Sequence, residues 1–325
     1  GGAGFLGCQI VHYFKLLNDS AILSTPCHLF AWDNYLRGIP DWLAEFNGNP
    51  GITMEKKDII NDIDYPKPDF IIHAASIASP IYYRKYPIET IDANVTGLRN
   101  LLNFSKENHI ESFLFFSTSE IYGDPDPAYI PTNEDYRGNV SCTGSRACYD
   151  ESKRFGETLC VNFWQIHNVP VKITRPFNNY GPGLKITDKR VIPDFFRDVI
   201  NNRDIIILSD GKTTRTFCYV SDAIDGYIRI LLSDYNGEPF NIGTRQPEIS
   251  MGELAKHIIN ISGKNLKVKY QTSSDSDYLT DNPQHRCPSI DKAKRLLGYN
   301  PKVSLEDGLR RTYDYYTTHP EAEES

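Results

Sequence analysis

Tyr149 and Lys153 form a pair that could remove a proton from a substrate hydroxyl. They stand four residues apart in a segment with a helical pattern, so both side chains share one helix face. A nearby ammonium lowers the pKa of a phenol, and the tyrosinate can act as general base while hydride leaves. Alone, a Y-x-x-x-K pair is more often a coincidental surface pair. Thr118 favours the catalytic interpretation, because its hydroxyl follows a buried strand at the end that faces the site crevice.

A glycine-rich segment opens the sequence and could bind a pyrophosphate. Gly1, Gly4 and Gly7 form G-x-x-G-x-x-G at the start of a helical pattern, where backbone N–H groups can approach a phosphate closely. Asp33 ends the next apolar run, and a carboxylate there can accept both ribose hydroxyls of NAD and would repel the 2′-phosphate of NADP. The alternative interpretation of Asp33 is a turn residue. Together these residues predict NAD as cofactor.

The elements that must position these groups read as alternating strands and helices. Strand-like runs cover residues 27–33, 69–76, 112–116 and 169–176, and helical patterns cover residues 8–17, 89–108 and 149–167. Such alternation predicts an α/β fold with a doubly wound parallel sheet. Because a strand normally precedes the glycine turn, we expect one before Gly1, and therefore a sequence that starts inside its first domain.

The pattern loosens after Pro176 and predicts a second, smaller unit. We predict an NAD-binding Rossmann domain over residues 1–175, to which residues 214–245 return. Residues 176–213 and 246–315 are predicted to form an α/β lobe that binds the substrate. The last residues, 316–325, read as a frayed tail.

Bulk composition excludes several classes of protein. The formal net charge is −7, which argues against a surface for nucleic acid or anionic membranes. No apolar run reaches the ~18 residues expected of a membrane span. The seven cysteines are irregularly spaced without a CxxC pair, which favours reduced thiols in a cytoplasmic protein and no metal site.

The motifs GGAGFLG, HAAS, STSEIYG, YDESK and RPFNNYGP occur in the order and spacing of the extended short-chain dehydrogenases. The chain therefore resembles the NAD-dependent epimerases and dehydratases of that family, and the resemblance covers nearly the whole chain. The resemblance implies a homodimer in which two long helices, at about residues 90–108 and 149–167, pair with their copies. It implies Thr118, Tyr149 and Lys153 as the catalytic triad. It also implies further cofactor-binding residues, namely Phe5, Leu6, Asn34, Asp58, Ile59, Ala74, Ala75, Asn94 and Ser117.

Within that family, several segments look like UDP-glucuronate decarboxylases, which form UDP-xylose. These segments are residues 78–87, 117–125, 146–154, 214–222 and 282–290. The resemblance implies oxidation at C4, loss of CO2 and re-reduction at C4. Glu120 would manage protons at C5, and Arg286 would hold the carboxylate or diphosphate, or supply a proton. Arg146 would also meet the carboxylate; for both arginines the alternative is a surface or packing cation. The remaining residues assigned to the UDP-sugar are Pro80, Tyr83, Ser119, Asn178, Arg190 and Arg215.

Two positions depart from the decarboxylase pattern and keep other reactions open. Asp92 and Gly183 stand where those enzymes usually carry Lys and Arg, so two positive charges are lost. One alternative is an NDP-hexose 4,6-dehydratase, although Ser119 replaces the acid that such enzymes use. Another is a 4-epimerase, where Glu120 is not expected. Outside enzymes, the alternative is an NAD-binding sensor, which often lacks the Tyr–Lys pair retained here.

Overall fold

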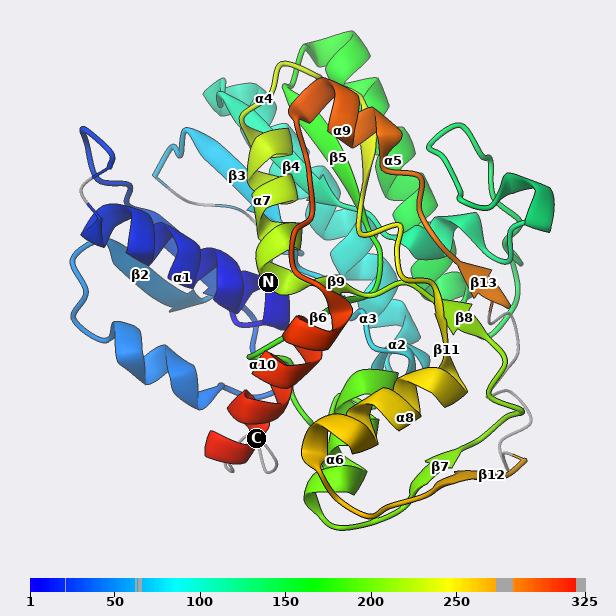
Figure 1. The fold of residues 1–325 in the computed structure, drawn as a ribbon. Coiled ribbons are helices and arrows are strands. Elements are labelled where there is room, and N and C mark those ends of the chain that lie inside the picture. Colours follow the sequence, from blue (N-terminus) through cyan, green and yellow to red (C-terminus); the bar gives the residue numbers. More distant parts are fainter. Residues whose placement is uncertain (21, 62, 64–65, 273–282, 320–325) are drawn as a thin grey trace.

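Strands and helices alternate along most of the chain in the computed structural model, which describes residues 1–20, 22–61, 63, 66–272 and 283–319 (Figure 1). A parallel sheet in the order β10-β5-β4-β3 forms its centre. Its strands are β3 (Phe70–His73), β4 (Ser112–Phe116), β5 (Val171–Pro176) and β10 (Pro239–Ile242). β4 is buried along its whole length, as its continuous apolar run predicts. The predicted α/β class with a doubly wound parallel sheet is confirmed.

Two further strands, β1 (Leu29–Asp33) and β2 (Ile52–Lys56), pair in parallel with each other. The glycine turn runs between them and the central sheet. The Gly2 N–H donates to the carbonyl of Trp32 at 2.9 Å, and a Cβ on Gly1 would lie 2.4 Å from the carbonyl carbon of Ala74. Since no side chain fits at Gly1, the glycine lets the turn lie against the carboxyl end of β3.

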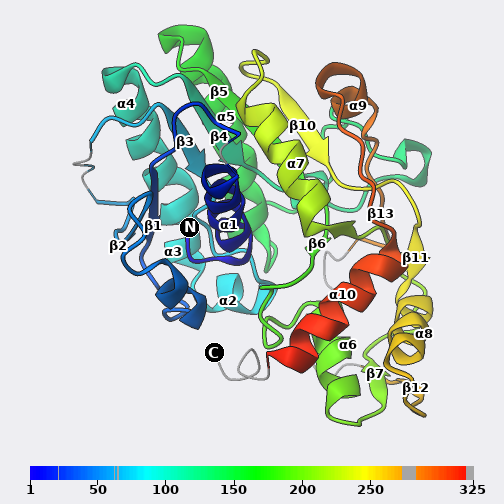
Figure 2. The ribbon, with the colours of Figure 1, turned by 60° about the vertical axis from the view of Figure 1, so that its left-hand side comes forward.

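Helices cover both faces of the central sheet (Figure 2). α1 (Phe5–Asp19) and α7 (Val220–Leu231) pack with Leu114 and Phe116 of β4. α4 (Leu98–Asn108) and α5 (Ala147–His167) pack with Phe113 and Phe115. Successive side chains of a strand point to opposite faces, so β4 alone contributes to both apolar layers.

The predicted helix over residues 89–108 is confirmed, with a local change in its winding. It consists of α3 (Pro87–Asp92), the π turn η2 (Ala93–Gly97) and α4, and it ends at His109 in the left-handed region. A Cβ on Gly97 would lie 2.6 Å from the side chain of Ile59, so the glycine admits this close contact. Single π turns inside helices often accompany functional sites.

A separate core holds the smaller lobe. α6 (Val191–Ile200), α8 (Met251–Ser262) and α10 (Leu305–Thr318) enclose buried side chains that include Phe196, Leu254 and Leu309. β7 (Ile205–Ile207) pairs in parallel with β12 (Val268–Tyr270). β8 (Thr214–Arg215) lies between β11 (Ile249–Ser250) and β13 (His285–Arg286). The other elements are η1 (Asp41–Phe46), α2 (Pro80–Lys85), η3 (Ser119–Tyr122), η4 (Pro127–Tyr129), β6 (Asn179–Tyr180), β9 (Cys218–Tyr219) and α9 (Asp291–Leu297).

The observed packing differs from the predicted domain ranges at three places. α10 continues to Thr318 and buries Tyr316 in the core of the lobe, although residues 316–325 are predicted to form a frayed tail. β8 pairs within the lobe, although residues 214–245 are predicted to return to the first domain; within that range α7 and β10 do pack there. α9 packs on β10 and α7, although its residues were assigned to the lobe, because Ile290, Ala293 and Tyr299 bury their side chains there. We therefore propose that residues 218–245 and 290–299 belong with the Rossmann domain. Among the described residues, no helix is both long and apolar enough to cross a membrane.

Candidate active site

A large cavity, about 1770 Å³, lies where the carboxyl ends of the central strands meet the lobe. Of the predicted site residues, Asn94 alone does not line its wall. Residues from the glycine turn, from β1 and from the loop after β3 form one part of the wall. Residues from the loop after β4, from α5 and from the lobe form the other part. The fold therefore brings together side chains that are far apart in the sequence.

The glycine turn has the shape that a phosphate-binding turn requires. A Cβ on Gly7 would lie 2.3 Å from the carbonyl oxygen of Gly1, so the first turn of α1 can close only around a glycine. Gly4 caps α1 in an extended conformation, and the N-terminal N–H groups of this helix border the cavity together with Phe5 and Leu6. A helix N-terminus favours an anion through its N–H groups and its dipole. These features fit the pyrophosphate of NAD.

Asp33 ties the end of β1 to the glycine turn. Its Oδ2 accepts the N–H of Ala3 at 3.1 Å, and its Oδ1 accepts the N–H of Tyr35 at 2.9 Å. The carboxylate therefore acts as a turn residue and also borders the cavity, where it can face ribose hydroxyls. Beside it, Asn34 donates to Asp58 at 3.0 Å, which joins two of the predicted adenosine contacts.

The proposed triad meets at the carboxyl end of β4. Thr118 accepts the N–H of Glu120 at 3.2 Å and so caps η3. Tyr149 and Lys153 lie one turn apart on α5, and the Lys153 Nζ donates to the carbonyl of Phe116 at 2.7 Å. This bond fixes the lysine between α5 and the end of β4, 6.0 Å from the centre of the Tyr149 ring.

Burial governs the pKa of both Tyr149 and Lys153 in this structure. Burial raises the pKa of Tyr149 to about 12, and the hydrogen bond to Thr118 is the largest influence in the opposite direction. Burial also lowers the pKa of Lys153 to about 7. The lysine nitrogen is directed at the Phe116 carbonyl, so the lowering of the phenol pKa by the ammonium stays a prediction.

Asn94 was predicted to contact the cofactor, and the structure places it elsewhere. It projects from the π turn, is fully buried, and donates to the Ser152 hydroxyl at 2.9 Å. Ser152 in turn donates to the carbonyl of Tyr149 at 3.0 Å. Asn94 thus supports the backbone of α5 behind the cavity, because the helix turns its side chain toward α5 and away from the cleft.

Glu120 stands at the centre of a cluster of arginines. Its two oxygens accept hydrogen bonds from the two terminal nitrogens of Arg286, each at 2.5 Å, and Glu120 also accepts one from Arg146. Burial alone would raise the pKa of Glu120, but Arg286 and Arg146 outweigh it and lower the pKa to about 2. The Tyr83 ring stacks on Tyr149, with 5.1 Å between ring centres and an angle of 8°. Tyr149 and this charged cluster therefore border the same cavity.

The remaining substrate residues border the same space. Arg215 donates to the carbonyls of Thr214 at 2.7 Å and Pro283 at 2.6 Å, and burial lowers its pKa to about 9. Asn178 donates to the Thr216 carbonyl at 2.9 Å. The other cavity-lining positions of this group are Pro80 at the start of α2, buried Ser119, and Arg190 before α6.

The two departures from the decarboxylase pattern both border the cavity. Gly183 has a φ of +84°, and a Cβ there would lie 3.0 Å from the side-chain nitrogen of Gln9. The local backbone therefore favours glycine over arginine. Lys185 and Lys189 follow closely on the same wall, so the segment keeps positive charge without an arginine at 183.

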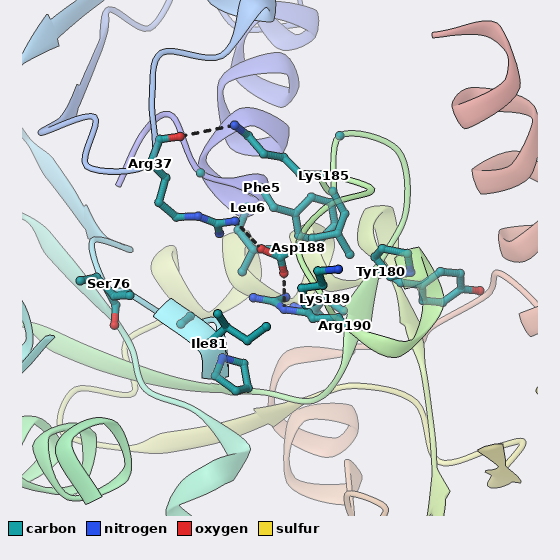
Figure 3. Close-up of a pocket in the computed structure, with 18 of the residues that line it drawn as sticks. Phe5, Leu6, Arg37, Ser76, Ile81, Tyr180, Lys185, Asp188, Lys189 and Arg190 are labelled. Atoms are coloured by element: carbon teal, nitrogen blue, oxygen red, sulfur yellow. Dashed lines mark hydrogen bonds and ion pairs between the residues drawn. The ribbon is translucent and has the colours of Figure 1, made fainter. Parts of the chain in front are cut away.

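The structure also shows a cluster that the sequence did not reveal. Asp188 is buried between two arginines, 2.7 Å from a terminal nitrogen of Arg37 and 2.8 Å from Nε of Arg190 (Figure 3). Figure 3 shows these side chains close to Phe5 and Leu6 at the start of α1. The cluster joins the loop after β1 to the segment before α6. Since no short motif spans so wide a separation, the sequence held no local signal for it.

A nucleotide-binding sheet with a Tyr–Lys pair at its carboxyl edge defines a class of NAD-dependent enzymes. A model of the NAD dependent epimerase/dehydratase family matches residues 1–243. The chain belongs to this family, and its cofactor is NAD.

Named relatives narrow the comparison. The chain is 37% identical over 309 residues to UDP-glucuronic acid decarboxylase 6 of Arabidopsis thaliana, covering 95% of this chain and 85% of that one. It is 34% identical to UDP-glucuronic acid decarboxylase 1 of Xenopus tropicalis, covering 97% and 70%. The structure of UDP-glucuronic acid 4-epimerase from Bacillus cereus, in complex with UDP-glucuronic acid and NAD, matches with a TM-score of 0.84 at 26% identity and covers 98% of each chain.

Proposed function

We propose that this protein is a UDP-glucuronate decarboxylase that produces UDP-xylose and CO2. One observation carries the proposal: Arg286 and Arg146 converge on Glu120 beside Tyr149, on the wall of the NAD cavity. A guanidinium binds a carboxylate through paired, charge-assisted hydrogen bonds, so this wall suits a sugar that carries a carboxylate at C6. The decarboxylases among the named relatives support the same substrate.

The first step removes hydrogen from C4 of the sugar. Tyr149 takes the hydroxyl proton as general base, and the Thr118 hydroxyl stabilises the tyrosinate by its hydrogen bond. Lys153 is held on the Phe116 carbonyl, 6.0 Å from the centre of the phenol ring. NAD held against the glycine turn and Asp33 would supply the hydride acceptor for C4 and the hydride for its re-reduction. The enzyme therefore needs no second substrate to reoxidise the cofactor.

The second step breaks the bond between C5 and C6. A ketone at C4 makes the C6 carboxylate a β-keto acid, which loses CO2 because the electron pair can move onto the ketone oxygen. Arg286 holds the carboxylate until it leaves, and Arg215 binds the diphosphate at the far end of the sugar. Glu120 manages the proton at C5 before hydride returns to C4.

Three other functions have less support in the geometry. A 4,6-dehydratase needs an acid at the position of Ser119, and a hydroxyl is a poor replacement. A UDP-glucuronate 4-epimerase would use the same base and the same carboxylate site, and the Bacillus cereus structure makes it the second candidate. It differs in one respect, because an epimerase must keep the carboxylate. A sensor without activity would not need the complete Thr-Tyr-Lys arrangement.

The roles of Glu120 and Arg286 can be tested by separating C4 oxidation from CO2 release. We expect Glu120→Gln to reduce CO2 release by ~10²-fold or more, because it removes an acid–base group, with NADH formation in a single turnover largely kept. Arg286→Met should raise KM for UDP-glucuronate about 10- to 100-fold, since charge-assisted hydrogen bonds are worth roughly 1.5–3 kcal/mol.

A matched control for the arginine is Arg245→Met. Arg245 is exposed, in a long ion pair with Asp291 at 3.9 Å, and it does not border the cavity. Equal losses of CO2 release and NADH formation in Glu120→Gln would contradict the assigned division of labour. Equal changes of KM in Arg286→Met and Arg245→Met would contradict the assigned role of Arg286.

We further propose that the protein is a cytoplasmic homodimer. α3 and α5 pack together and carry exposed apolar side chains, with Ile88 65%, Phe155 49% and Ile166 67% exposed. Such side chains on two adjacent helices support a four-helix interface with a second copy. All seven cysteines are unpaired, which supports a reducing compartment.

A further inference from the structure

Asp150 carries a buried carboxyl group next to the catalytic tyrosine. This carboxyl group has no role in the steps above. It is 4% exposed and does not border the cavity. Its Oδ2 lies 3.5 Å from Nε of Arg146, and its Oδ1 has no hydrogen-bond partner among the described residues. The hydroxyl of Tyr83 and Nε of Arg146 are likewise buried without one. Buried polar atoms without a partner are rare and costly, so this group calls for an explanation.

Arg146 is shared by two carboxyl groups. One terminal nitrogen binds Glu120, and its Nε edge faces Asp150. Both oxygens of Glu120 also accept hydrogen bonds from a second cation, Arg286. The ion pair described for Asp150 is with the Nε edge of Arg146. Two neighbouring buried carboxyl groups do not both ionise readily, and the one with fewer cations keeps a proton. Consistently, burial and the charge of Glu120 raise the pKa of Asp150 to about 7.

The proposed reaction consumes one proton for each CO2. When the C5–C6 bond breaks, its electron pair remains on the sugar as an enolate across C5, C4 and the C4 oxygen. That pair must then form a C5–H bond with a proton from an acid. Tyr149 holds the proton taken from the C4 hydroxyl, which must return to that oxygen when hydride returns. A different acid is therefore required at C5.

We propose that Asp150 and Glu120 share one proton across Arg146, and that this pair supplies the proton C5 receives. The inference rests on the proposed function. With Arg286 and Arg146 on Glu120, the proton resides on Asp150. When the sugar carboxylate engages Arg286, Glu120 loses part of its positive surroundings and takes up a proton from water in the cavity, while Asp150 releases one and keeps Arg146 as its counter-ion. Glu120 borders the cavity, so it can give the proton to C5 and return to the carboxylate form. The pair then regains a proton from water.

The groups around this pair come from five elements. Asp150 is influenced by Glu120 on η3 and by Arg286 on β13, besides Arg146 just before α5. Arg215 on β8 acts on Glu120. The remaining titratable neighbours of Asp150 are Tyr83 on α2 and Cys148 and Tyr149 on α5. None of these neighbours of Asp150 carries a carboxyl group. Among the described residues named here, Glu120 and Asp150 are therefore the only two carboxyl groups that can share a proton.

Asp150→Asn tests the inference through the pH dependence of CO2 release. Asn keeps the size of the side chain and cannot hold the shared proton. In the wild type, CO2 release should fall as pH rises through the neutral range, because the pair loses its proton. In Asp150→Asn this fall should move to lower pH, with CO2 release at least 10-fold slower at pH 7.5. NADH formation in a single turnover should stay within twofold of the wild type, because C4 oxidation does not use this proton.

Two further variants separate proton storage from a structural role. Asp150→Glu restores a titratable group and should restore the neutral fall. Glu151→Gln removes the adjacent carboxylate, which pairs with Arg154 at 3.6 Å and does not border the cavity, and should change nothing. If Asp150→Asn fails to bind NAD, infrared spectra of the wild type decide, since a protonated carboxyl band at pH 6.5 should vanish by pH 9.

An Asp150→Asn enzyme that folds, oxidises C4 and keeps the wild-type pH profile of CO2 release would overturn the inference and leave the proposed function intact. So would the absence of a titrating carboxyl band in the wild type. A wild type that oxidises C4 of UDP-glucuronate without releasing CO2 at any pH would overturn the proposed function itself, and this inference with it.

Discussion

At the residue scale, the phenol of Tyr149 has the clearest chemical role. Tyr149→Phe should lower C4 oxidation by ~10²–10⁴, because it removes the general base. The ring can still stack on Tyr83, so the fold and the NAD content should be unchanged. NADH absorbance in a single turnover measures the first effect, and the cofactor released on denaturation measures the second. Near-wild-type turnover would exclude Tyr149 as the base.

Asp33 tests the placement of the ribose. Asp33→Ala should weaken NAD binding about 10-fold or more, since hydrogen bonds to a charged group are worth roughly 1.5–3 kcal/mol. Equilibrium dialysis with NAD gives the affinity. Asp41→Ala is the matched control, because Asp41 also borders the cavity but lies on η1, away from the end of β1. Unchanged affinity in Asp33→Ala would show that the ribose lies elsewhere.

Single residues also show which parts of the candidate site could be predicted from the sequence. Motifs identified Thr118, Tyr149 and Glu120 because each stands at a fixed offset from a recognisable strand or helix. They failed for Asp188, whose partner Arg37 lies on a distant loop, and for Asp150, whose burial depends on the packing of η3 and β13 against α5. They also misplaced Asn94, because a π turn sets where its side chain points.

At the element scale, the long helices were predictable because their apolar periodicity is strong and their ends are well marked. The sequence predicted a helix over residues 149–167, and α5 spans Ala147–His167. α8 likewise begins behind a Ser250–Glu253 capping box, which is a strong sequence signal for the start of a helix. Two-residue strands such as β8 carry no periodicity, which is why the domain ranges differed there.

The same helices supply a test of assembly. If α3 and α5 form a dimer interface, Phe155→Glu should convert a dimer at micromolar concentration into a monomer, because it buries a charge in an apolar contact. Light scattering after size exclusion reports the mass. Leu232→Glu is the control, since Leu232 is 66% exposed just after α7. A wild type that is monomeric at that concentration, or loss of the dimer in both variants, would contradict the proposed interface.

At the scale of the whole molecule, two separately packed cores meet at one cavity. The glycine turn and Asp33 come from the first unit, and Arg286 and Arg215 come from the lobe. The predicted ranges also put Arg286 in the lobe, whereas they put Arg215 in the first domain. The bounds of the segments that belong to each unit could not be predicted, because they depend on which core buries Ile290 and Tyr299.

The most direct test of the central claim is a comparison of substrates. The NAD-loaded protein is incubated separately with UDP-glucuronate, UDP-glucose and dTDP-glucose, and the products are identified by mass spectrometry. We expect UDP-glucuronate alone to be consumed rapidly, with loss of CO2 and formation of a UDP-pentose. Turnover of a neutral hexose with loss of water, and none of UDP-glucuronate, would contradict the account. Asp92 and Gly183 would then have been the informative residues, and the protein would be a dehydratase.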